Sequence, residues 1–90
     1  MTTFPAIPVE TLVLAARLAQ EFTNAKSVVT ARLDPDGLRF TLRNRQTREM
    51  ANVIVSWLEL THARSAHALI MVTLERCFGM LNLTPPARQS

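Results

Sequence analysis

The sequence has very few of the residues that build phosphate loops, disulfides and metal sites. Its 90 residues include one cysteine and two glycines, Gly37 and Gly79. A lone cysteine can form neither an internal disulfide bond nor the cysteine pair of a zinc site. Two isolated glycines cannot build a glycine-rich phosphate-binding loop. The sequence therefore excludes a disulfide framework and a P-loop, and it gives no sign of an oxidising compartment.

Bulky aromatic residues and long apolar runs are also scarce. The chain has one tryptophan, four phenylalanines and no tyrosine, so its core must consist mainly of aliphatic side chains. No apolar run approaches the roughly 20 residues that span a bilayer. The first apolar run, residues 11–19, contains Arg17 and lacks the basic start of a secretory signal. We therefore expect a cytoplasmic protein without a membrane span.

The composition that remains is that of a folded domain. Hydrophobic residues make up 48% of the chain and charged residues 19%, a balance typical of globular proteins. We expect one domain over residues 1–83 and a flexible C-terminal tail over residues 84–90, which begins with Thr-Pro-Pro. A small domain with few bulky anchors often gains buried surface by self-association, so we expect a homodimer or a protein partner.

A β-hairpin is the clearest structural pattern in the sequence. Apolar residues alternate with polar ones in residues 29–33 and 38–42, and the sequence Asp-Pro-Asp-Gly at 34–37 separates the two runs with turn-forming residues. Pairing Leu33 with Leu38 places all the alternating apolar residues on one face, whereas a shift by one residue would mix the two faces. We predict an antiparallel hairpin in this register.

Positive charge is concentrated in and just after this hairpin. Residues 32–48 contain five arginines and two aspartates and account for the whole net charge of +3. On the face opposite Phe40, the predicted hairpin presents three of these arginines, and the other two follow at its end. The five residues are Arg32, Arg39, Arg43, Arg45 and Arg48.

Helical periodicity predicts a helix on each side of the hairpin. Residues 8–24 have apolar side chains at steps of three and four with polar residues in a narrow opposite arc. Residues 64–82 repeat the pattern with a broader apolar arc, which is typical of a helix central to the core or shared with a partner. Small or apolar residues on the outward arc of this second helix are candidate interface residues, unless the first helix covers them. They are Ala68, Val72 and Gly79.

Residues 47–60 fit two structures. On a helical wheel their polar side chains share one arc of roughly 100°, whereas a two-residue period would place Ser56 on the same face as Ile54 and Leu58. The sequence Val-Ile-Val at 53–55 favours a strand. We predict a helix over 47–60, with a third strand at 52–60 as the alternative. The expected fold is a small α+β domain of order α-β-β-α-α, with α-β-β-β-α as the alternative.

No motif indicates catalysis or metal binding. His62 and His67 are five residues apart, so they do not share a helix face as zinc ligands at i, i+4 would, and Cys77 lies on an apolar arc. The Asp34 turn resembles a calcium loop, but Arg45 stands where the loop requires a bidentate carboxylate. No Gly-x-Ser-x-Gly motif surrounds a serine. We expect no enzyme activity, no cofactor, no metal and no small-molecule substrate.

The basic hairpin face is the only feature that resembles a binding site. Guanidinium groups bind carboxylates and phosphates, and a two-stranded ribbon can enter a DNA groove. Sheets that bind nucleic acid usually also expose aromatic side chains for stacking, whereas Phe40 is expected to face inward. The expected function is a non-catalytic interaction or adaptor module, with nucleic-acid binding through the arginines as the alternative. A face that is merely solvated is also compatible with the pattern.

Overall fold

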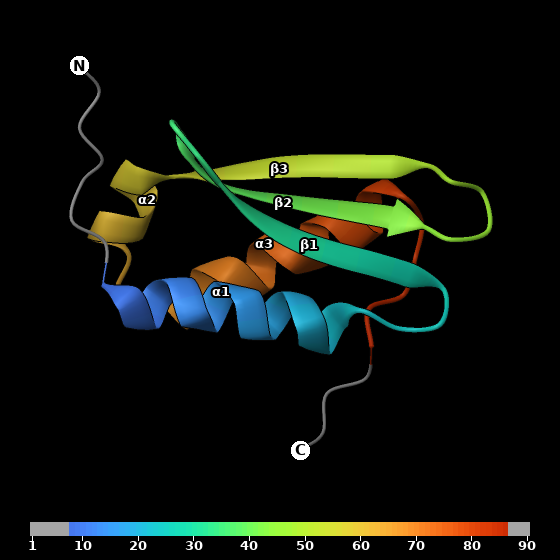
Figure 1. Cartoon of the computed structure of the whole chain (residues 1–90), viewed down its shortest axis with the longest axis horizontal. Helices are drawn as coiled ribbons and strands as arrows, with labels where there is room; N and C mark the ends of the chain where they lie inside the picture. The colour runs from blue at the N-terminus through green and yellow to red at the C-terminus, as the bar shows by residue number, and fades with distance from the viewer. Residues whose placement is uncertain (1–7, 87–90) are drawn as a thin grey trace.

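Helices cover one face of a three-stranded antiparallel sheet, and no described element covers the opposite, bare face (Figure 1). A computed structural model describes residues 8–86. In sheet order the strands are β1, β2 and β3, with β2 in the centre. The elements along the chain are α1 (Val9–Phe22), β1 (Ser27–Asp34), β2 (Gly37–Asn44), β3 (Met50–Ser56), α2 (Trp57–His62) and α3 (Ala66–Met80). The predicted α+β class is confirmed.

The predicted hairpin is confirmed together with its register. Leu33 lies opposite Leu38, Ala31 opposite Phe40, and β1 and β2 pair along their whole length. The inner face of the sheet is the apolar one, and Phe40 at its centre is 0% exposed. Because side chains alternate along a strand, burial of this face turns the neighbouring residues of β2 outward.

Residues 47–60 do not form the predicted helix. The alternative with a third strand is what the structure shows, although β3 spans Met50–Ser56 and the chain is helical again from Trp57. Val53 pairs with Phe40 and Val55 with Leu38 on the inner face of the sheet. The third strand thus pairs with the edge of β2 that β1 leaves free, and it adds branched apolar side chains to the face that the helices cover. A lone hairpin is marginally stable in water and requires such an extension.

The boundary between β3 and α2 explains why helical periodicity predicted the wrong structure for residues 47–60. The Ser56 hydroxyl accepts a hydrogen bond from the backbone N–H of Glu59 (3.1 Å), and the Glu59 carboxylate accepts one from the backbone N–H of Ser56 (3.3 Å). This capping box marks the start of a helix. A single helical wheel over 47–60 therefore combined the end of a strand with the beginning of a short helix.

The two long helices are shorter than expected by one or two residues at each end. The first was predicted over 8–24 and the last over 64–82. Past the end of α1, Asn24 shapes the turn into β1 by accepting hydrogen bonds from the backbone N–H groups of Lys26 (2.7 Å) and Ser27 (3.1 Å). The predicted tail over 84–90 lies largely outside the described residues, as do residues 1–7.

The core lies between the inner face of the sheet and the helices α1 and α3. Phe22 of α1 and Phe78 of α3 join the two helices, with ring centroids 5.7 Å apart. In α3, Ile70, Leu74 and Phe78 are each 0% exposed. Aliphatic burial of this kind stabilises by about 25 cal/mol per Å² of apolar surface, so the scarcity of aromatic residues is offset by a continuous aliphatic layer.

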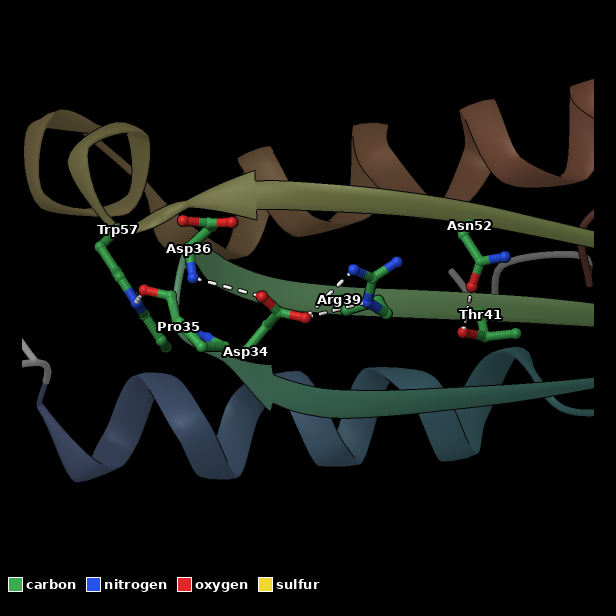
Figure 2. A network of polar contacts seen from close by, with 7 residues as sticks. All are labelled: Asp34, Pro35, Asp36, Arg39, Thr41, Asn52 and Trp57. Carbon is green, nitrogen blue, oxygen red and sulfur yellow. Dashed lines mark hydrogen bonds and ion pairs between the residues drawn. The ribbon is translucent and has the colours of Figure 1, made fainter. Parts of the chain in front are cut away.

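The turn between β1 and β2 packs tightly against the start of α2 (Figure 2). The indole N–H of Trp57 donates a hydrogen bond to the carbonyl oxygen of Pro35 (3.0 Å), and the Trp57 backbone N–H donates to the carbonyl of Asp36 (3.3 Å). A Cβ atom at Gly37 would overlap the carbonyl oxygen of Val55. Glycine is therefore required at position 37 by the close approach of two backbones.

The two glycines of the chain make a matched pair for testing this contact. Gly37→Ala should lower the free energy of unfolding by at least about 2 kcal/mol, because the backbones of β2 and β3 must separate. Gly79→Ala, in a helix with open space around the added methyl, should raise it by about 0.5–1 kcal/mol. Urea unfolding measures both values. Equal and small effects would show that the strands tolerate the extra group.

Candidate binding surface

The bare face of the sheet carries most of the polar side chains of the strands, and we call it the outer face. Strand pairing arranges its central residues in three rows, each taking one residue from β1, one from β2 and one from β3. The rows are Arg32–Arg39–Ile54, Thr30–Thr41–Asn52 and Val28–Arg43–Met50.

The three strand arginines share this face, as predicted. Arg32 and Arg43 are exposed, and Arg39 on the central strand is half-buried. The helices α1 and α3 pack against the other side of the sheet, so no described element covers these side chains (Figure 1). The strand geometry therefore places Arg32 and Arg43 in solvent and leaves Arg39 partly accessible, so that an external partner can contact this face.

Asp34 fixes the position of Arg39 (Figure 2). The Nε and Nη2 atoms of Arg39 each lie 3.1 Å from Oδ2 of Asp34. The other Asp34 oxygen, Oδ1, accepts a hydrogen bond from the backbone N–H of Asp36 (3.3 Å). Arg32 lies directly opposite Arg39 on β1, and like charges in such a pair repel each other. The carboxylate offsets this repulsion.

The surroundings of Asp34 favour its ionised form. The backbone hydrogen bond from Asp36 and then the hydrogen bond from Arg39 lower the pKa of the Asp34 carboxyl below its ordinary value of 3.8, and the charge of Arg32 acts in the same direction. Asp34 is thus a carboxylate at neutral pH. The end of the outer face nearest the β1–β2 turn therefore holds two guanidinium groups and one compensating negative charge.

The centre of the outer face is neutral. The Thr41 hydroxyl donates a hydrogen bond to the side-chain oxygen of Asn52 (2.7 Å) across β2 and β3 (Figure 2). This row separates Arg39 from Arg43, so the positive charge occurs at two ends of the face and not as one continuous patch.

Arg45 and Arg48 lie in the loop that joins β2 to β3, and both are exposed. They are beyond the three rows of the outer face, on the loop that follows Arg43. Arg48 has a backbone φ of 66°, a left-handed conformation that costs a non-glycine residue about 1–2 kcal/mol. The Asn44 side chain holds the loop by accepting hydrogen bonds from the N–H groups of Gln46 (2.9 Å) and Thr47 (3.2 Å).

The candidate interface residues of the last helix lie on its exposed side. Ala68, Val72 and Gly79 are all exposed, and Val72 retains 52% of its accessible surface. The first helix contacts α3 on the side of Phe78 instead. Within residues 8–86, α1 therefore does not cover this arc.

The described residues show no cluster of metal ligands, and the one cysteine is buried. Among residues 8–86 no three histidine, cysteine or acidic side chains cluster as metal ligands do. Cys77 is 1% exposed, and burial raises the pKa of its thiol. A thiol of this kind behaves as a small hydrophobic side chain. Both histidines are exposed.

The sequence reasoning missed the contribution of β3 to the outer face. Ile54 and Met50 extend the rows of Arg39 and Arg43, and Asn52 extends the neutral row between them. Met50 and Ile54 keep 57% and 36% of their surface exposed. The Val-Ile-Val sequence and the Ser-x-x-Glu capping signature at 56–59 were the signals that could have placed these residues on a strand.

No protein-family model, curated protein or solved structure matches the chain. Within residues 8–86, none of the helices has the length and apolar character needed to cross a bilayer.

The Asp34 carboxylate should make stability sensitive to acid. Its pKa is lower in the folded chain than the ordinary value of 3.8, so its contribution is present above that pH and is lost as the pH falls through the folded-state pKa. Asp34→Asn removes this contribution but can keep the turn hydrogen bond. Between about pH 5 and about pH 2, the wild-type urea midpoint should fall further than that of the variant; parallel curves would contradict the assignment.

Proposed function

We propose that this chain is a non-catalytic interaction module whose outer face binds an acidic surface of a partner protein. One observation carries the proposal: Arg32, Arg39 and Arg43 project from a sheet face that no described element covers. A guanidinium group can form two parallel hydrogen bonds to a carboxylate, which gives both affinity and orientation.

The composition of the outer face supports a protein partner. Arginine and methionine are enriched at protein interfaces, and a good interface combines charged groups with apolar contact area. The outer face offers Met50 and Ile54 beside Arg43 and Arg39 on the neighbouring strand. Neutral hydrogen-bonding side chains, Thr41 and Asn52 among them, lie between the arginines.

The three arginines differ in whether an ion pair already engages their guanidinium groups. Asp34 already engages the Nε and Nη2 atoms of Arg39, so this guanidinium group has fewer free donors for a partner. Arg32 and Arg43 form no ion pair within the described part of the chain. They are free to take a carboxylate from a partner, one at each end of the outer face.

Nucleic-acid binding is the second candidate, because guanidinium groups serve phosphates equally well. Among the described residues the outer face carries no aromatic side chain, since Phe40 is buried beneath it. A nucleic acid would therefore be held by its phosphates without base stacking, and Arg45 and Arg48 would extend the contact along the loop. Such binding weakens steeply with added salt.

Charge reversal on the two sides of the molecule tests the proposal. The variant Arg32→Glu/Arg43→Glu should lose at least tenfold in affinity for a polyglutamate peptide, since two attractive contacts become repulsive. The control Arg17→Glu/Arg64→Glu has the same net charge but alters exposed positions on the helical side, and it should bind as the wild type does. Fluorescence anisotropy with labelled probes measures both affinities.

The same assay distinguishes the partner classes. A single-stranded DNA oligonucleotide that binds more tightly than the peptide, with a steep salt dependence and the same loss in the outer-face variant, would replace the protein partner by a nucleic acid. Absence of binding to either probe at low salt, or equal losses in both double variants, would contradict a role for the outer face.

Removal of the Asp34 carboxylate should raise the affinity for an acidic partner, whereas the charge reversals lower it. Asp34→Asn releases Arg39 from its ion pair and adds one net positive charge to the outer face, so affinity for the polyglutamate peptide should rise several-fold at low salt. Asp36→Asn, in the same turn and exposed, makes the same change in net charge away from Arg39. If both variants bind equally, net charge and not the Arg39 contact determines affinity.

A further inference from the structure

The strand β3 is an edge strand without a charged side chain. Its sequence, Met-Ala-Asn-Val-Ile-Val-Ser, also lacks proline and glycine. Edge strands are usually protected by charges, proline or a covering segment, because their free backbone groups pair readily with another strand. In the described chain no strand pairs with β3 on the side away from β2.

The other edge of the sheet is protected at its beginning. The Thr23 hydroxyl donates to the carbonyl of Val29 and accepts from its N–H, at 3.3 and 2.9 Å. The backbone N–H of Asn24 donates to the carbonyl of Ser27 (2.9 Å). Arg32 adds a charge to the remainder of β1. Within residues 8–86 the sheet thus has one edge that is partly covered and one that is left open.

On β3, every second residue directs its backbone N–H and C=O groups away from β2. The Asn44 N–H donates to the carbonyl of Glu49 (2.8 Å), so the backbone N–H and C=O groups of Asn44 point toward β3. The same holds for the backbone groups of Leu42 and Phe40. Their partners Ala51 and Val53 face β2 in return. The N–H and C=O groups of Met50, Asn52 and Ile54 consequently point away from the sheet.

We propose that β3 pairs with β3 of a second copy of this chain, antiparallel about a twofold axis at Asn52, so that the two sheets form one sheet of six strands. In this register Met50 lies opposite Ile54 of the second copy, and Asn52 lies opposite its own equivalent. All three outward-pointing residues then exchange backbone hydrogen bonds with the other chain.

Side chains on both faces match in this register. On the outer face the exposed Met50 and Ile54 cover each other, and two amides meet at the axis, where they can form hydrogen bonds. On the inner face Ala51 lies opposite Val53 of the second copy, so apolar meets apolar. A shift of two residues would instead place Asn52 opposite Met50 or Ile54 and remove this match.

Charge separation favours β3 over β1 as the pairing edge. In this register the row of Arg39 and Ile54 continues into Met50 and Arg43 of the second copy. Neighbouring strands are about 4.8 Å apart and two strands lie between the copies of β2, so Arg39 lies about 14 Å from Arg43 of the second copy, beyond the Debye length of about 8 Å at physiological salt. If β1 paired with itself near its open end, Arg32 would lie beside its equivalent at about 5 Å. The uncharged strand is the edge that a second copy can approach.

This inference goes beyond the outer-face proposal and does not depend on it. Sedimentation equilibrium should give twice the chain mass of 10.1 kDa for the wild type. Met50→Lys/Ile54→Lys should give the single mass, because two lysines face two lysines. Met50→Glu/Ile54→Lys should restore the double mass, because the same positions now pair opposite charges. The reversal between the two double variants tests the register itself.

Folding of the variants is checked by far-ultraviolet circular dichroism, since all substituted side chains are exposed. Val72→Lys, on the open arc of α3, should remain a dimer. In the wild type, the amide hydrogens of Met50, Asn52 and Ile54 should exchange at least tenfold more slowly in the dimer than after dilution to the monomer. A monomeric wild type, a dimer unaffected by the two lysines, or dissociation by Val72→Lys alone would each overturn the proposal.

Discussion

Burial of Phe40 beneath the central strand is the constraint on which the rest of the structure depends. Its ring is fully enclosed by the helices, and a strand cannot turn one residue inward without turning its neighbours outward. Arg39 and Thr41 therefore face solvent whatever their own preferences. The outer face is a consequence of the core, because the same alternation that fills the inner face places Arg32 of β1 and Arg39 and Arg43 of β2 on one side of the sheet.

This coupling explains what the sequence could and could not predict. The hairpin was predictable in register because its two faces differ strongly and the Asp-Pro-Asp-Gly turn fixes the pairing. The third strand was ambiguous because its outer side chains, Met50 and Ile54, are apolar despite facing solvent. Alternation is weak in such a strand, and only pairing with β2, a tertiary contact, decides in its favour. The arginine rows were predicted; their apolar neighbours were not.

The turn between β1 and β2 contributes both to the fold and to the outer face. Asp34 caps the turn and also neutralises part of the charge where Arg32 and Arg39 lie side by side. Pro35 offers its carbonyl to Trp57, which ties the turn to the start of α2, while Gly37 permits the close approach of β3. The sequence identified the turn, but the contacts that join it to residues 55–57 involve segments far apart in the chain and depend on the fold.

The distribution of charge over the sheet gives the molecule two surfaces with different physical behaviour. Contacts through the arginine rows are electrostatic and weaken as salt screens them. Contacts along β3 would consist of backbone hydrogen bonds and apolar side chains, which salt hardly weakens. The two surfaces share Met50 and Ile54, which lie in rows with Arg43 and Arg39. A second copy at β3 would thus lengthen the outer face and bury its apolar margin, leaving the arginines as the part that a further partner contacts.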